Sequence, residues 1–271
     1  MKRSVSNLKR AILLWRKNAK VRLMARMAYP GNFFILTISV IAHMVLNIVF
    51  MNVIFNFVSD FSGWTYREAL VIIAGYMIID GINWALFANL TGITRNIVNG
   101  DMDFVLVKPL DTQLYVSIYR ADPEDWSRVV LGVAVLIYAI AGLDISGWAL
   151  SINLLLYSAL LLSGIVIFYS INLIIKSISF WTIQGWGLQP ITEAILYGSR
   201  FPTGIFTHKF VRIFFYTALP IAFLASVPAE FLVKLPDFYL LGASFLIAIV
   251  FFYVSRKFFY FALSHYASAS S

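Results

Sequence analysis

Long apolar stretches separated by short polar segments dominate the chain. A helix that crosses a bilayer needs about 20 mostly apolar residues at 1.5 Å each. Five stretches fit this pattern, the third being the shortest: Phe33–Val58, Ala69–Leu90, Val129–Leu143, Trp148–Ile175 and Phe238–Ser255. The pattern therefore predicts an all-α, polytopic membrane protein.

The segment between residues 178 and 233 is apolar but interrupted. Ile178–Leu196 is apolar enough to cross and gives a sixth transmembrane helix, although Gly185, Gly187 and Pro190 interrupt it. The residues after it are broken up by Pro202, Pro220 and Pro228. Non-helical backbone at membrane depth survives only where protein or a water-filled cavity surrounds it. We therefore expect a re-entrant extracellular hairpin at about residues 200–233, before the last span.

Composition and charge narrow the class and set the topology. Of 271 residues, 61% are hydrophobic and 13% charged, which excludes a soluble globular domain and a disordered chain. There is no Cys, so disulfides and thiolate metal sites are excluded. With both termini cytoplasmic, six spans place most of the 21 Lys and Arg residues on the cytoplasmic side, as the positive-inside rule requires. Among these topology markers are Arg128, Lys176 and Arg256, the last of which stops the final span.

Residues 1–30 form a separate basic segment before the permease-like region 31–271. Within it, Leu8–Lys20 has an apolar side that includes Ile12 and Trp15 and a basic side that includes Arg16 and Lys17. Such a helix lies in the headgroup plane against anionic lipid. We therefore expect residues 8–20 to form an interfacial elbow helix. The pattern does not decide whether this helix also contacts a cytoplasmic partner.

The only sizeable predicted cytoplasmic loop is 91–127. Phe104, Leu106 and Leu110 are apolar side chains in an otherwise polar loop, and Lys108 before Pro109 ends their segment. Exposed apolar side chains outside a membrane are typical of a docking surface for another protein. The alternative is a loop that folds back onto its own helix ends.

Sequence motifs for chemistry are sparse. The chain has no phosphate-loop, dinucleotide, zinc-protease or hydrolase-elbow motif, so we expect no catalysis, no metal and no cofactor on this chain, and no nucleic-acid partner. Asp101 and Asp103 form a DxD pair, but carboxylates two residues apart do not face the same way on a helix.

A few polar side chains lie inside the predicted spans. Asp80 has Tyr76 four residues before it and Asn83 three residues after it, so the three share one stripe; Glu193 lies near the end of the fifth span. Intramembrane carboxylates face a bundle interior or a cavity. These four residues are candidates for a translocation path, or they pack helices together.

These features resemble the membrane subunits of type-2 ATP-binding-cassette exporters. The branch of that family with a Gly-x-x-Asp-x-x-Leu-x-x-Pro-Leu signature is matched by Gly100, Asp103, Leu106, Pro109 and Leu110. Two weaker likenesses are Arg200-Phe201-Pro202 and the tail 265–270; after the first, the chain departs from the family's Ile-Tyr-Pro-like run.

The resemblance implies a six-span half-permease in the cytoplasmic (inner) membrane, paired with a second permease subunit as a homodimer or heterodimer. Separate ATPase subunits would carry ATP and Mg, and efflux of a hydrophobic or amphipathic solute would follow alternating access at the dimer interface. The residues expected to contact the ATPase are Gly100, Asp101, Asp103, Phe104, Leu106, Lys108, Pro109 and Leu110. Two rival functions stay open: an ion-coupled carrier using Asp80 and Glu193, and a membrane glycosyl or phosphoryl transferase using Asp101 and Asp103.

Overall fold

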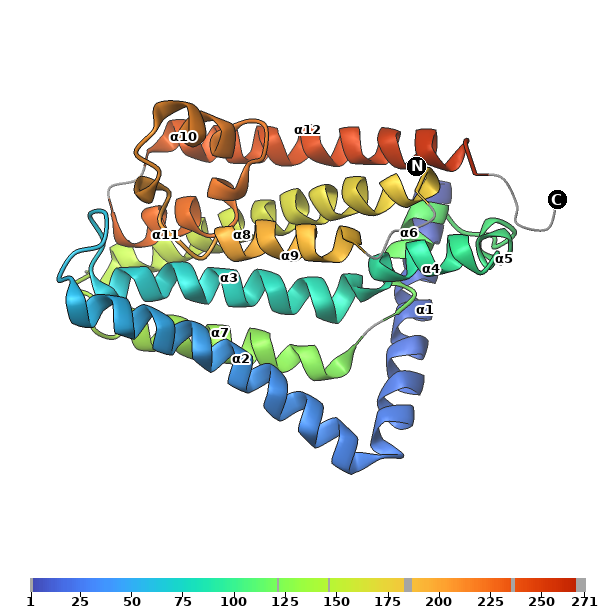
Figure 1. Cartoon of the computed structure of the whole chain (residues 1–271), viewed down its shortest axis with the longest axis horizontal. Coiled ribbons are helices and arrows are strands. Elements are labelled where there is room, and N and C mark those ends of the chain that lie inside the picture. The colour runs from blue at the N-terminus through green and yellow to red at the C-terminus, as the bar shows by residue number, and fades with distance from the viewer. Residues whose placement is uncertain (1, 121, 146, 183–186, 235–236, 267–271) are drawn as a thin grey trace.

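The computed structural model describes residues 2–120, 122–145, 147–182, 187–234 and 237–266, and for residues 2–11 it describes the backbone. All regular secondary structure in this part of the chain is helical (Figure 1). The all-α prediction is confirmed. The last residues of the tail motif, 267–270, lie outside the described residues.

Four helices within the described ranges are long and apolar enough to cross a membrane. They are α2 (Pro30–Phe57), α3 (Tyr66–Phe87, extended by α4 to Val98), α8 (Gly147–Ser177, extended to Phe180) and α12 (Phe238–Leu263). The starts of α2 and α12 follow known helix-start preferences: α2 has Pro30 in its first turn. The Asp237 side chain caps α12 by accepting from the Tyr239 N–H.

Two of the six predicted spans are shorter than a crossing helix. α7 (Trp126–Ile140) has 15 residues, about 22 Å at 1.5 Å per residue. Ile178–Leu196 is not one helix: a 3-10 turn, η3 (Ile178–Phe180), is followed by the 11-residue α9 (Leu188–Gly198). A crossing over 178–196 would therefore have to use a broken segment, and the sixth span stays a prediction.

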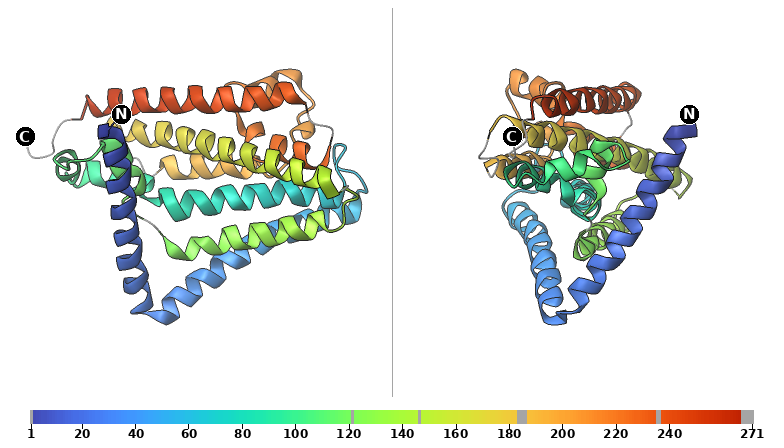
Figure 2. Two further views of the ribbon diagram at one scale, coloured as in Figure 1. Left: turned by 180° about the vertical axis from the view of Figure 1, so that it is seen from behind. Right: turned by 90° about the vertical axis from the view of Figure 1, so that its right-hand side faces the viewer.

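The helices α2, α3, α7, α8, α9 and α12 run lengthwise through one bundle (Figure 1). α1 (Lys2–Met27) runs across one end at a steep angle to them (Figure 2). It contacts the loop after α6 through polar groups: Asn18 donates to the Tyr119 carbonyl at 3.1 Å, and Arg26 pairs with Glu124 at 2.8 Å. The interfacial placement of this helix stays a prediction.

Short helices gather at the two ends of the bundle (Figure 1). The predicted cytoplasmic loop folds as α4 (Gly92–Val98), α5 (Met102–Leu106), α6 (Thr112–Ile118) and the 3-10 turn η2 (Pro123–Asp125), at the end where α1 lies. The opposite end carries α10 (Lys209–Tyr216) and α11 (Ser226–Val233); η5 (Thr203–Ile205) precedes α10, and η6 (Ile221–Phe223) lies between the two helices. This is the region predicted to be re-entrant; its depth in a bilayer stays a prediction.

The bundle core is built around α3 and α8. α3 is buried along most of its length and packs on α7, where Gly132 lies so close to α3 that a Cβ would meet the Ala74 carbonyl at 3.1 Å. α8 packs against α12 and α11, and Gly164 brings it against the backbone of Leu224. Small residues at such contacts let helix backbones approach closely.

Candidate functional site

The predicted docking segment contains a two-faced short helix. In α5, Met102 and Val105 are buried, in one apolar cluster with Leu173 of α8 and Phe259 of α12. A turn with Gly100 at φ +74° leads into α5, a conformation that favours glycine. The helix ends at Leu106, three residues before Pro109.

The other face of α5 is exposed. Phe104 is 69% exposed and Val107, which the sequence pattern did not single out, is 77% exposed; Leu106 also faces outward. Of the remaining candidates, Asp101, Lys108 and Pro109 are exposed, whereas Asp103 and Leu110 are half-buried. The structure therefore presents an apolar surface at this end of the bundle, rather than a loop folded entirely onto itself.

Three of the four candidate path residues line one polar cavity. Asp80 and Asn83 of α3 and Glu193 of α9 border a cavity of about 180 Å³ together with His43 of α2. Tyr76 is buried beside it, its ring 6.3 Å from the ring of Tyr197, which lines the same cavity. Among the described residues, the Tyr76 hydroxyl has no hydrogen-bond partner.

Charges around this cavity are connected by hydrogen bonds between helices. Arg128 of α7 pairs with Asp80, and its Nε lies 2.8 Å from Asp125. Lys176 of α8 donates to Gln189 Oε1 at 2.6 Å, and Gln189 donates to Glu193 at 3.0 Å. These charged and amide side chains of α3, α7, α8 and α9 are thus paired with one another inside the bundle.

Arg128 and Lys176 were predicted only as topology markers, not as partners of these groups. Arg128 lies three residues after Asp125, a helical spacing, but no helical spacing connects Arg128 with Asp80 or Lys176 with Gln189, which lie on different helices. The one available signal was general: a carboxylate such as Asp80 inside a bundle requires a cation nearby.

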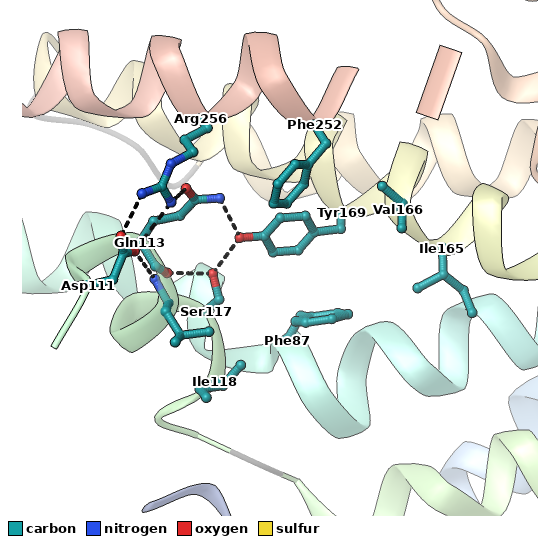
Figure 3. A pocket seen from close by; sticks show the side chains of 11 residues that line it. Phe87, Asp111, Gln113, Ser117, Ile118, Ile165, Val166, Tyr169, Phe252 and Arg256 are labelled. Carbon is teal, nitrogen blue, oxygen red and sulfur yellow. Dashed lines mark hydrogen bonds and ion pairs between the residues drawn. The ribbon is translucent and has the colours of Figure 1, made fainter. Parts of the chain in front are cut away.

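A second, larger pocket was not predicted at all. It has a volume of about 630 Å³ and lies between the end of α3, α6, α8 and α12. Polar side chains gather at one end, with Phe87, Phe252, Ile165 and Val166 beyond them (Figure 3).

Hydrogen bonds join the polar end of this pocket across three helices. Arg256 of α12 donates to Asp111 Oδ2 at 2.6 Å and to Gln113 Oε1 at 2.8 Å. Gln113 donates to the Tyr169 hydroxyl at 3.0 Å, and Ser117 shares a 2.7 Å hydrogen bond with the same hydroxyl.

Asp111 also caps α6 by accepting from the Leu114 N–H at 3.0 Å. Partial burial acts to raise the pKa of Asp111, but the hydrogen bonds from Arg256 and from the Leu114 N–H outweigh it and hold the pKa below its usual value. The Asp111 carboxylate is therefore charged at neutral pH.

An all-helical bundle in which four of the described helices are long and apolar enough to cross a membrane is the architecture of a multi-pass membrane protein. Residues 41–270 match the family described as ABC-2 family transporter protein. The chain belongs to this family, and it is thus a permease of an ATP-binding-cassette exporter, which works with an ATP-binding-cassette subunit. No curated protein and no solved structure gives a significant match to the chain.

Proposed function

We propose that two permease subunits of this kind form a dimer in the cytoplasmic membrane and that α5 receives the movement of a separate ATPase. The observation that carries the proposal is the two-faced geometry of α5. Phe104 and Val107 are available to a partner, while Met102 and Val105 are fixed in the bundle.

The packing of α5 explains how movement would reach the membrane helices. The cluster that holds Met102 and Val105 also contains Leu173 of α8 and Phe259 of α12. Because packed interiors are dense and transmit displacement, a shift of α5 moves the cytoplasmic ends of both helices. ATP binding on the partner would in this way open and close the dimer interface.

The polar cavity supports a cargo that is amphipathic. Asp80 is compensated by Arg128. Glu193 forms no ion pair within the described part of the chain, where Gln189 donates to it. A cationic group of a hydrophobic solute would be stabilised beside Glu193, with Tyr76, Asp80 and Asn83 forming the neighbouring wall.

The test of α5 is Phe104→Asp, compared with Phe210→Asp at the opposite end of the bundle. Both side chains are largely exposed, at 69% and 81%, so neither substitution disturbs the core. A charge in the centre of an apolar docking surface is desolvated without a partner and costs binding. We expect Phe104→Asp to abolish ATP-dependent transport and co-purification of the ATPase, with normal insertion.

Phe210→Asp lies far from α5 and should leave ATPase co-purification unchanged. Normal transport by Phe104→Asp, or an equal loss in both variants, would remove α5 from the coupling role. Both proteins are compared at equal membrane abundance.

The ion-coupled carrier stays a second candidate because Asp80 and Glu193 line the same cavity. Transport that continues without ATP and collapses with the proton gradient would favour it. The transferase alternative would be supported by metal-dependent turnover that is lost in Asp103→Ala.

A further inference from the structure

The larger pocket, between α6, α8 and α12, has no role in the path or in ATPase docking proposed above. Its lining residues and those of the polar cavity are two separate sets. It lies where the chain returns from α5 to the bundle, and α8 and α12 form its walls. We name this pocket the α8–α12 groove.

The groove changes from polar to apolar along the helices. On α12, Phe252 and Arg256 are one turn apart on the same face, and on α8 Ile165 and Tyr169 are likewise one turn apart. Four residues of α-helix span about 6 Å. Asp111, at the start of α6, marks the polar end as the end nearest the predicted cytoplasmic loop (Figure 3). With the predicted topology, the groove therefore changes from polar to apolar in the same direction as a lipid of the inner leaflet, from its headgroup to its acyl chains.

The polar end carries one cation and one anion. Arg256 and Asp111 form an ion pair at 2.6 Å, and both are partly exposed, with 43% and 25% of their side chains accessible. A guanidinium has five N–H donors and binds phosphate well, and a carboxylate accepts from an ammonium group. The pair therefore offers opposite charges at one site to a ligand that also carries both.

We propose that the α8–α12 groove binds a zwitterionic phospholipid with a primary ammonium headgroup, of the phosphatidylethanolamine type. The phosphate would lie against Arg256, the ammonium group against Asp111, and one acyl chain along Phe252, Val166 and Ile165. An anionic phospholipid binds less well because the Asp111 carboxylate repels its uncompensated charge. The proposal rests on the predicted topology and not on the coupling role of α5.

The experiment measures lipid retention by the full-length protein. The protein is placed in mild detergent with equal amounts of phosphatidylethanolamine and phosphatidylglycerol, and bound lipid is counted by native mass spectrometry. The wild type should retain one phosphatidylethanolamine per protomer in preference to phosphatidylglycerol. Arg256→Gln should weaken its retention roughly tenfold to hundredfold, since charge-assisted hydrogen bonds are lost.

Two matched pairs of variants test whether lipid retention depends on the groove itself. Lys257→Gln removes the neighbouring, exposed cation that does not line the groove and should leave retention unchanged. Val166→Trp fills the apolar end and should displace the lipid with the Arg256–Asp111 pair intact. Leu162→Trp, one turn away on α8 and 64% exposed, should not displace the lipid.

Equal retention of the two lipids, no retained lipid, or undiminished retention in Val166→Trp would overturn the proposal. So would an equal loss in Arg256→Gln and Lys257→Gln. Phe104→Asp should retain the lipid, so a failure of the coupling proposal and a failure of the lipid site are distinguishable.

Discussion

Replacing Arg128 tests whether the polar cavity depends on a compensated charge. Asp80 is only 3% exposed, and Arg128 pairs with it and with Asp125. The Arg128 guanidinium also lies 5.9 Å from the centre of the Trp84 ring. Arg128→Met keeps most of the side-chain length and removes the charge, which deprives two buried carboxylates of the cation that they share.

The expected loss follows from the burial of that charge. Removing one partner of a buried ion pair costs about 3–5 kcal/mol, because the remaining charge is uncompensated. Replacing both partners of a pair costs much less, so Arg128→Met combined with Asp80→Asn should recover the part of the loss that comes from Asp80, while Asp125 still lacks its cation. Such non-additivity is what a direct contact produces.

The assay is reversible unfolding by dodecyl sulfate in mixed micelles, followed by the circular dichroism signal, which gives a free energy of unfolding. The matched control is Arg67→Met at the other end of the bundle, where Arg67 donates to the Tyr138 carbonyl at 3.3 Å and lies over the Tyr138 ring. It should cost about 1 kcal/mol or less. If Arg128→Met costs no more than this control, or the double variant is no more stable than Arg128→Met alone, the charge-compensation reasoning is refuted.

Two further predictions use stability measurements. Gly164→Ala should lower the free energy of unfolding by about 1–3 kcal/mol, because the added Cβ would come within 2.9 Å of the Phe223 carbonyl oxygen. In Gly242→Ala the added Cβ would meet no described atom within 4 Å. This variant should raise the free energy of unfolding by up to about 1 kcal/mol, because alanine favours a helix more than glycine does. Equal losses in the two glycine variants would contradict this. Burial raises the pKa of Asp125 to about 6. The folded protein therefore binds this proton more tightly than the unfolded chain, which stabilises the wild type below pH 4 by up to roughly 3 kcal/mol relative to Asp125→Asn. This stabilisation should be lost as the pH rises through 6. Thermal unfolding of the wild type and of Asp125→Asn in a nonionic detergent from pH 4 to 7 checks this prediction. A stability difference between the two proteins that does not change with pH would contradict it.

The long apolar helices could be located from the sequence because hydropathy over 20 residues is a local property. The predicted stretch Phe33–Val58 is α2, at Pro30–Phe57, and Trp148–Ile175 lies within α8. The end of α5 before Pro109 was also predictable, since proline restricts the residue before it.

The break before α9 was not predicted because mean hydropathy does not record where a helix is interrupted. Gly187 and Pro190 were visible, but they are compatible with a kinked span as well as with a new start. What favours the break is tertiary: Lys176 at the end of α8 reaches Gln189 in the first turn of α9. That contact requires the two helix ends to lie close together, which no local pattern shows.

The candidate path residues share a stripe that the helical period gives directly, and the structure buries Tyr76, Asp80 and Asn83 together. Their partners were not predictable in the same way. Arg256 was interpreted only as the cytoplasmic stop of the last span, yet it reaches Asp111, which lies 145 residues earlier. A charged residue at a membrane boundary satisfies the positive-inside rule whatever its side chain contacts. The rule therefore gives no information on ion pairs such as Arg256–Asp111.

The ion pairs at the end of the bundle that carries α5 are arranged in a way that is compatible with the proposed movement of α5. The loop between α4 and α7 is fastened to α1 by Arg26–Glu124 and to α12 by Arg256–Asp111, and both pairs are partly open to solvent. Partly exposed pairs contribute little each, so they fix a position without a large barrier to exchange. α5 is instead anchored by apolar packing of Met102 and Val105, which does not exchange with water. If α5 has the proposed coupling role, a force on Phe104 would move α5 as one body with the adjoining ends of α8 and α12, while the ion pairs around it rearrange.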